Sequence, residues 1–200
     1  MRTKYKPWAK PYLEEHLEVQ VPHDSFSSLD NIYLEIGSGK GQFLVDMALK
    51  FPEREFIGVE RNVTCSGFVA KKLVENEINN AKLIYIDAEK LLNEMKEKSV
   101  NIIYLNFSDP WPKTKHHKRR LTSERFCALY RKVLKEEGCI IQKTDNLDLF
   151  EFSIETFKSH GFKIIEIDRN YMTNDEDVLT EYESDFRRDN LPIYRMKVVA

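Results

Sequence analysis

The sequence is poor in glycine, proline and cysteine, and it has no long apolar run. Seven glycines and seven prolines among 200 residues form no low-complexity tract or flexible linker. The sequence contains no stretch of about 18 apolar residues, so we expect no membrane span. It also contains no apolar segment near the start that would indicate a secretory signal. Cys65, Cys127 and Cys139 are far apart and form no Cys-x-x-Cys pair. We therefore expect reduced core thiols in a cytoplasmic protein.

The sequence also has no large excess of charge of one sign, because the formal net charge is −2. Its distribution is uneven. Residues 1–12 and 113–120 carry bases without acids, whereas residues 175–185 carry acids without bases. Such runs are most often solvated faces, but a local field can steer a polyanion even when the total charge is small.

The length predicts one domain over residues 1–200, with residues 1–30 as an N-terminal arm or a short helix laid on it. Beyond the arm, short apolar runs alternate with segments of helical period. Runs of this kind suit strands buried on both faces of a sheet. We expect strands at 32–36, 55–60, 82–86, 100–107, 139–144, 162–168 and 193–199.

Three helices are specified by their apolar stripes. One covers about 43–51 and stops at Pro52, one covers about 126–134, and one covers about 147–160. Thr122 or Ser123 suits the N-cap of the second helix, and Gly138 lies just past its expected end. The last two strands have no clear helix between them. The pattern predicts an α/β, Rossmann-like fold of the class I methyltransferase type, with a seven-stranded, mostly parallel sheet, an antiparallel C-terminal strand and helices on both faces.

A glycine-rich turn, Gly37-Ser38-Gly39-Lys40-Gly41, directly follows the first expected strand. It lacks the first glycine and the Ser/Thr of a P-loop, and Gln42 stands where a dinucleotide site has its third glycine. Glu35 would repel a pyrophosphate, but it suits a cationic ligand that presents an amino group. S-adenosylmethionine fits, so we expect Glu35, Gly37, Gly39 and Gly41 to bind this cofactor.

Two further acids end the next two strands. Glu60 follows the glycine turn at the distance at which an acid accepts hydrogen bonds from ribose hydroxyls. Asp87 lies where an adenine amino group would be met. Each acid alone is more simply a polar strand terminus. Three acids at successive strand ends beside a glycine turn favour the cofactor site.

The fourth strand runs into Asp109-Pro110-Trp111-Pro112. Proline biases the residue before it toward an extended conformation, so we expect Asp109 and Trp111 to be extended in a stiff loop. The loop resembles the Asp/Asn-Pro-Pro-aromatic tetrapeptide of enzymes that methylate amino groups of nucleic acids. The alternative is a tight turn with a packed tryptophan.

A basic run follows this loop directly. A polyanion held by its cations would bind with strong salt dependence. Two adjacent histidines lack metal-ligand spacing, so we expect no metal. The run contains the cations Lys113, Lys115, Lys118, Arg119 and Arg120 and the two histidines His116 and His117.

Together these residues closely resemble the bacterial tRNA (guanine-N7)-methyltransferase family over essentially the whole chain. The matching motifs are Lys6-Pro7-Trp8-Ala9, Glu35-Ile36-Gly37-x-Gly39-Lys40-Gly41, Gly58-Val59-Glu60, Asp109-Pro110-Trp111-Pro112-Lys113, His116-x-Lys118-Arg119-Arg120-Leu121-Thr122, Lys143-Thr144-Asp145-Asn146 and Thr180-Glu181-Tyr182-Glu183. The resemblance implies methyl transfer from S-adenosylmethionine to N7 of guanine 46 in the variable loop of tRNA.

The resemblance also implies roles for individual residues. Glu35, Glu60, Asp87 and Asp109 would contact the cofactor or lie at its edge, and Asp109 is the candidate catalytic residue. Substrate contacts would come from Lys113, Asp145, Thr180 and Glu183. The resemblance implies RNA contacts from Lys115, His116, His117, Lys118, Arg119 and Arg120. Guanine N7 has a free lone pair, so no strong base is required. We hypothesise that Asp109, helped by Asp145 or Glu183, holds the guanine and offsets the charge that develops on it. Asp145 has an alternative role as the N-cap of the next helix.

Two other functions remain open from the residues alone. One is methylation of an exocyclic amine of a base or of a protein glutamine. The other is a non-catalytic RNA-binding module on a degenerate methyltransferase fold, which would fail to bind S-adenosylmethionine. We expect tRNA as the partner and no membrane association. Both monomer and homodimer remain possible.

Overall fold

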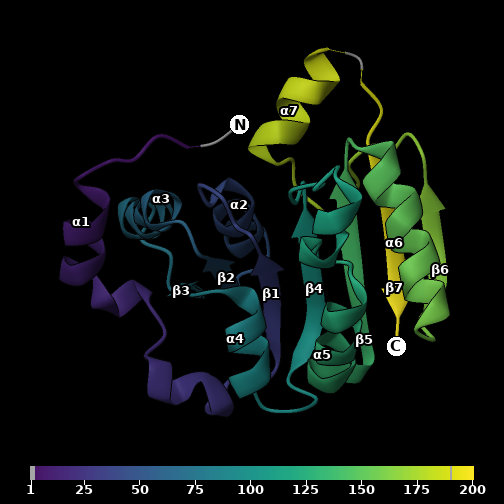
Figure 1. Ribbon diagram of the computed structural model, residues 1–200. Helices are drawn as coiled ribbons and strands as arrows, with labels where there is room; N and C mark the ends of the chain where they lie inside the picture. Colours follow the sequence, from purple (N-terminus) through teal and green to yellow (C-terminus); the bar gives the residue numbers. More distant parts are fainter. Residues whose placement is uncertain (1–2, 190) are drawn as a thin grey trace.

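The computed structural model describes residues 3–189 and 191–200, which include a seven-stranded sheet (Figure 1). Its order is β3-β2-β1-β4-β5-β7-β6. The strands are β1 (Ile32–Ile36), β2 (Glu55–Glu60), β3 (Ala81–Tyr85), β4 (Val100–Asn106), β5 (Leu134–Thr144), β6 (Lys163–Asp168) and β7 (Tyr194–Val199).

Neighbouring strands from β3 to β5 are parallel, and β7 is antiparallel to both β5 and β6. The predicted seven-stranded, mostly parallel sheet with an antiparallel C-terminal strand is therefore confirmed. Because β1 to β5 run the same way, their carboxyl ends meet at one edge of the sheet. Ligands of open α/β sheets bind at this edge.

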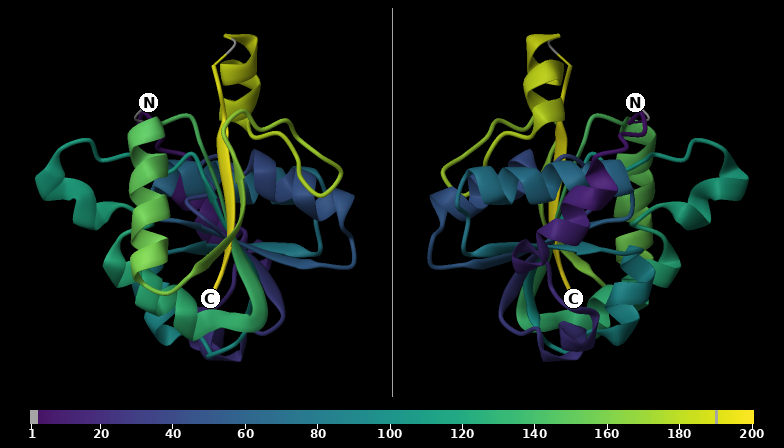
Figure 2. Two further views of the ribbon diagram at one scale, coloured as in Figure 1. Left: turned by 90° about the vertical axis from the view of Figure 1, so that its right-hand side faces the viewer. Right: turned by 90° about the vertical axis from the view of Figure 1, so that its left-hand side faces the viewer.

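Helices cover both faces, as Figure 2 shows with the sheet seen from its two ends. On one face, α1, α2 and α3 bury apolar side chains such as Leu13, Leu44 and Val69. On the other face, α4, α5 and α6 bury side chains such as Leu91 and Phe126. The bounds are α1 (Ala9–Glu15), α2 (Gln42–Lys50), α3 (Val63–Glu75), α4 (Ala88–Glu94), α5 (Glu124–Val133) and α6 (Leu147–Ser159).

The N-terminal segment lies against the body of the protein, with α1 packed on α3. A Cβ added at Gly67 of α3 would come within 2.5 Å of the Ala9 Cβ, so only glycine permits this approach. The ring of Trp8 meets that of Phe68 edge to face at 5.0 Å. Two short 3-10 helices, η1 (Leu17–Val19) and η2 (His23–Ser28), complete the segment.

Two predictions around the helices were wrong. A helix, α7 (Glu181–Arg188), does lie between the last two strands, and it stands above the carboxyl edge of the sheet (Figure 1). Gly138 does not end α5, because the chain passes directly from Val133 into β5 and Gly138 lies within that strand. Ser123 is the N-cap residue of α5, although its side chain makes no capping hydrogen bond.

The three cysteines are buried and free. Among the described residues, no helix is long and apolar enough to cross a membrane.

Candidate active site

A cleft of about 620 Å³ opens at the carboxyl edge of the sheet. This volume lies within the range of small-molecule sites. The turns that follow β1, β2, β3 and β4 form its walls, and Tyr182 of α7 reaches it from above. A smaller pocket continues from it beneath Lys40, Thr180 and Glu181.

The glycine turn after β1 forms one wall. Gly37 and Gly39 have φ of +82° and +54°, and a Cβ at either residue would meet nothing within 4 Å. The conformation favours glycine, and the space above the backbone is open to a ligand. Gly41 lies differently: a Cβ there would meet Val69 of α3 at 3.0 Å. Gly41 therefore serves close packing of the turn on α3 as well as lining the smaller pocket.

Glu35 is a buried carboxyl group in the floor of the smaller pocket. Asn106 Nδ2 donates to its Oε1 at 3.1 Å, while its Oε2 has no hydrogen-bond partner among the described residues. Burial raises the pKa of Glu35 to about 7, although the hydrogen bonds of Asn106 and Ser38 and the charge of Lys143 act in the opposite direction. A buried oxygen without a partner is costly, so this position suits a cationic donor.

Glu60 links two of the turns that frame the cleft. The amide N–H of Gly39 donates to its Oε2 at 3.0 Å, and that of Asn62 donates to its Oε1 at 2.7 Å. Burial raises the pKa of Glu60 despite these bonds. A carboxylate has about four acceptor sites, so both oxygens retain capacity for a ligand hydroxyl.

Asp87 lines the cleft and is also the N-cap residue of α4. Its Oδ1 accepts the amide N–H of Glu89 at 3.0 Å, and its Oδ2 lies 3.7 Å from Arg61 Nη1. The simpler interpretation as a polar terminus therefore describes one of its roles. Because Asp87 also lines the cleft, its carboxylate can contact a bound ligand as well.

Asp109 is exposed, lines the cleft and makes no hydrogen bond or ion pair within the described ranges. Phe107 and Trp111, on either side of it, have φ of +49° and +41°. The expected extended conformation of Trp111 was thus wrong: the fold overrides the local preference set by Pro112. Left-handed aromatic residues cost on the order of 1–3 kcal/mol each and gather where a loop is held for function.

The basic run folds into η3 (Thr114–Arg119), which projects on the side of α4, α5 and α6 (Figure 2). Lys113 and Lys115 are exposed, while Lys118 and Arg119 are exposed and also line the cleft. The guanidinium of Arg119 lies 5.0 Å from the ring centroid of Trp111.

The histidines of the run are half-buried against aromatic rings. His116 meets Trp111 at 5.8 Å, and His117 meets Phe152 at 5.4 Å. Arg120 departs from its prediction altogether, because its side chain is completely buried and bonded to the protein. A guanidinium without exposed surface does not reach RNA in this arrangement, so we withdraw that assignment for Arg120.

The other predicted substrate residues do not gather at one point. Asp145 is exposed and does not line the cleft, and Asn146 rather than Asp145 caps α6 by accepting the amide N–H of Leu149 at 2.8 Å. Thr180 lines the smaller pocket, and its Oγ1 accepts the amide N–H of Glu183 at 3.0 Å.

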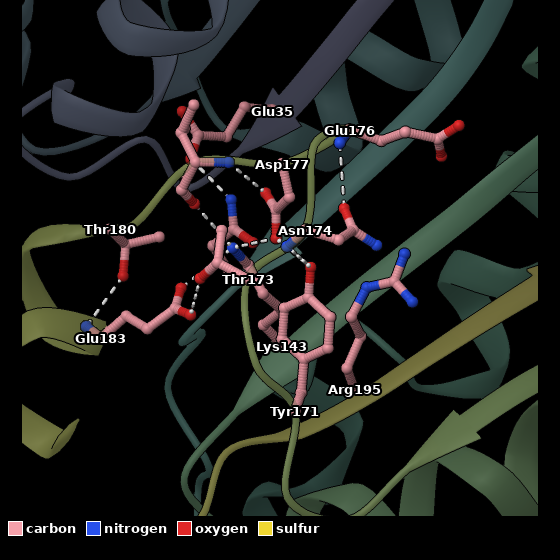
Figure 3. A network of polar contacts seen from close by, with 12 residues as sticks. Glu35, Lys143, Tyr171, Thr173, Asn174, Glu176, Asp177, Thr180, Glu183 and Arg195 are labelled. Atoms are coloured by element: carbon pink, nitrogen blue, oxygen red, sulfur yellow. Dashed lines mark hydrogen bonds and ion pairs between the residues drawn. The ribbon is translucent and has the colours of Figure 1, made fainter.

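Glu183 is a residue of α7, and its side chain is fully buried in the network that Figure 3 shows. Its oxygens accept from Lys143 Nζ at 3.1 Å, Thr173 Oγ1 at 3.0 Å and Arg187 Nη2 at 2.7 Å. Burial alone raises its pKa, but Lys143 and these hydrogen bonds outweigh burial, so the pKa of Glu183 is lowered. Its carboxylate is therefore occupied within the protein and does not face the cleft.

The sequence analysis missed Lys143, the fully buried centre of this network. Its ammonium also donates to Asp177 Oδ2 at 2.8 Å and to the carbonyl of Val178 at 3.1 Å. Asp177 is buried too, so the acidic stretch is not simply a solvated face. One signal was available, because a lysine at the end of a buried strand requires an anionic partner.

Asn106 and Tyr182 were missed as well, although both line the cleft. Asn106 is the last residue of a buried strand beside the predicted acids. Tyr182 lies in the acidic stretch, where Phe186 is its one aromatic partner at helical spacing. No group of three or more His, Cys, Asp or Glu side chains within residues 3–189 and 191–200 forms a candidate metal site.

Comparison with known proteins shows the family to which the chain belongs. A family model described as a putative methyltransferase matches residues 30–196. The tRNA (guanine-N(7)-)-methyltransferase of Staphylococcus haemolyticus is 42% identical over 207 residues, which cover 98% of this chain and 97% of that protein. The enzyme of the same name from Exiguobacterium is 40% identical over 210 residues, covering 100% and 98%. The chain belongs to the tRNA (guanine-N7)-methyltransferase family.

Solved structures agree on the fold. A structure described as an antibiotic related methyltransferase matches with a TM-score of 0.65 at 14% identity, covering 100% of this chain and 97% of that one. The 16S rRNA methyltransferase KamB matches with a TM-score of 0.64 at 12% identity, covering 88% and 92%. At these identities the likeness concerns the fold alone, and it confirms the Rossmann-like class I methyltransferase architecture.

S-adenosylmethionine, the methyl donor that the family implies, fits the residues present. The unpartnered Oε2 of Glu35 suits its amino group, and the open space above Gly37 and Gly39 admits a ligand against the backbone. An acid in the floor of the site disfavours a phosphate. The cleft is thus built for a cationic cofactor without a pyrophosphate.

Proposed function

We propose that this protein transfers a methyl group from S-adenosylmethionine to N7 of the variable-loop guanine, position 46, of tRNA. The observation that carries the proposal is that the smaller pocket holds Glu35, with its unpartnered buried oxygen, and that the adjoining cleft is lined by exposed Asp109. The names of its 40–42% identical relatives support the same substrate.

The cofactor, when bound, supplies an electrophilic methyl group on a sulfonium. We assign Glu35 to its amino group and Glu60 to its ribose hydroxyls. Gly37 and Gly39 let the ligand lie close to the backbone. Asp87, on the rim, is assigned to the adenine amino group.

Asp109 acts on the acceptor. Guanine N7 carries a lone pair and no proton, so the reaction needs no strong general base. The methylated ring is cationic, and a carboxylate beside the base stabilises the charge that develops in the transition state. The stiff, strained loop around Asp109 fixes the approach of the base to the methyl group, which is the other main contribution to rate.

Substrate and RNA contacts remain proposals. We assign Lys113, Asp145 and Thr180 to the substrate, and Lys115, His116, His117, Lys118 and Arg119 to the RNA. Glu183 contacts the guanine only if its bonds to Lys143 and Arg187 open. In the closed arrangement it supports α7, whose rings of Tyr182 and Phe186 lie on Phe107.

Further parts of the proposal concern the whole chain. We propose that residues 1–200 act as one domain with residues 1–30 as an arm. We also propose that the protein works in the cytoplasm, as a monomer or a homodimer.

Incubation with labelled S-adenosylmethionine and unmodified tRNA, followed by reduction and aniline cleavage, tests the proposal. Scission at the variable-loop guanine is the expected result, because only the N7-methylated ring opens under this treatment. Label without scission would favour exocyclic amine methylation. Absence of both cofactor binding and label would favour the non-catalytic RNA-binding module.

A further inference from the structure

Arg119 and Arg120 are adjacent in sequence but lie in opposite environments. The side chain of Arg119 is exposed at the cleft, whereas that of Arg120 is 0% exposed. A polyanion meets exposed cations, so burial divides the basic run into two parts with different functions. Arg120 is the one buried residue among the lysines and arginines of residues 113–120; the others are exposed.

Arg120 is bonded to both the acceptor loop and a helix. Its Nε donates to the carbonyl of Pro110 at 2.8 Å, and its Nη2 donates to Asp148 Oδ2 at 2.6 Å. Its guanidinium lies 4.5 Å from the ring centroid of Phe152. Asp148 and Phe152 both belong to α6, so Arg120 ties the loop to a helix packed on the sheet.

The bond to Pro110 is the anchor of the loop. Within the described residues, it is the one hydrogen bond that the backbone of residues 108–112 receives from outside the segment. Pro110 lies between Asp109 and the left-handed Trp111. A strained conformation persists only when its surroundings hold it. Arg120 holds the loop at Pro110, the residue that follows Asp109 in the chain.

We propose that Arg120 is a positioning residue that holds Asp109 at the cleft through the Pro110 carbonyl, rather than a contact for RNA. The inference rests on the proposed methyl transfer, in which Asp109 faces the acceptor. The planar guanidinium makes both bonds and stacks on Phe152 at once. An ammonium at the same place lacks this geometry.

The test compares Arg120→Met and Arg120→Lys with the matched neighbour variant Arg119→Met. Three quantities are measured for each protein: kcat with saturating tRNA, the Kd for tRNA at several salt concentrations, and the Kd for S-adenosylmethionine. For both Arg120 variants we expect kcat to fall roughly 10- to 100-fold, because a small misplacement of a reacting group slows the chemical step by about this factor. Their tRNA affinity and its salt dependence should match the wild type.

Arg119→Met should behave differently. Its tRNA affinity should weaken, and the slope of log K against log salt should become shallower by about 0.7 to 0.9, the value for one phosphate contact. If the Arg120 variants instead weaken tRNA binding and flatten the salt dependence while kcat stays at the wild-type value, Arg120 is an RNA contact and the inference is overturned.

Asp148→Ala keeps the inference testable if the Arg120 variants fail to fold, because the Asp148 side chain is 71% exposed. It removes one of the two bonds that orient Arg120, so kcat should fall by a smaller factor with tRNA affinity unchanged. An unchanged kcat would contradict the positioning role. The wild-type assay separates the two proposals, since a wild-type protein that methylates no tRNA contradicts the proposed function itself.

Discussion

The ammonium of Lys143, at the carboxyl end of β5, donates to the buried carboxylate of Glu183 in α7 at 3.1 Å. Neither side chain is exposed to solvent. The pair joins the roof of the cleft to the central sheet. Lys40 and Lys72 hold the same helix from outside through Glu181, at 3.3 and 3.2 Å.

Breaking this buried pair should destabilise the protein strongly. Lys143→Met leaves Glu183 and Asp177 without their shared cation, and removal of one partner of a buried pair costs about 3–5 kcal/mol. Urea unfolding followed by circular dichroism measures the loss. The double variant Lys143→Met/Glu183→Gln should recover part of it, because one of the uncompensated charges is gone. Equal stabilities of wild type and Lys143→Met would show that the pair is not formed.

Glu35 should make the cofactor-free protein less stable as pH rises. Its pKa rises on folding from 4.5 to about 7, so the folded state binds more protons than the unfolded state between these values. Stability therefore falls from about pH 4.5 and levels off above about pH 7. Glu35→Gln removes this dependence and should be more stable than the wild type at pH 8, by up to about 3 kcal/mol. Urea unfolding at pH 5 and pH 8 checks it; a variant no more stable at pH 8 contradicts it.

The same substitution should weaken cofactor binding. An amide in place of the carboxylate loses a charged hydrogen bond to the amino group, worth about 1.5–3 kcal/mol. We expect the Kd for S-adenosylmethionine, measured by calorimetry at pH 8, to rise roughly 10- to 100-fold. Glu55→Gln, at an exposed position in β2, is the control. Unchanged affinity in Glu35→Gln would remove Glu35 from the cofactor site.

Gly67→Ala should destabilise the protein even though alanine favours helices. The new Cβ would lie 2.5 Å from the Ala9 Cβ and 2.8 Å from the Ala9 Cα. Overpacking of this kind costs about 1–3 kcal/mol, more than the gain in helix propensity. Chemical denaturation measures the change. Ala9→Gly in the same chain should restore part of the loss, and failure to do so would argue against the packing of α1 on α3.

Asp109→Asn tests the proposed role in the chemical step. The substitution removes the negative charge and keeps the shape, so single-turnover methylation should slow by about 10²-fold or more, the scale of a lost electrostatic contact. Affinity for S-adenosylmethionine is measured separately. Wild-type chemistry with normal cofactor binding would exclude Asp109 from that role.

The sheet was predictable because its strands are short apolar runs, and several of these runs end in glycine or acidic residues. The helix α7 was not, because Glu-Tyr-Glu-Ser-Asp-Phe-Arg-Arg offers only Tyr182 and Phe186, one turn apart, as an apolar face. In the fold these two rings lie on Phe107, and ion pairs join the helix to Lys143 and to the lysines of distant elements. Only the three-dimensional structure brings these charges together.

The site was predictable in outline for a similar reason. Acids at the ends of successive parallel strands must meet, and Glu35, Glu60 and Asp87 do line connected pockets. The basic run gave no indication that Arg120 alone is buried. The proline rule for Trp111 failed because a contact from a distant residue, the bond of Arg120 to the Pro110 carbonyl, holds the loop next to Trp111. The roles assigned to these residues stay predictions.

Replacement of the variable-loop guanine of tRNA by 7-deazaguanine tests the central claim most directly. The change exchanges N7 for a carbon and leaves the exocyclic amine intact. With labelled S-adenosylmethionine, we predict full methylation of the unmodified tRNA and none of the substituted one. Undiminished labelling of the 7-deaza tRNA would contradict the account, because the methyl group would then go to another atom.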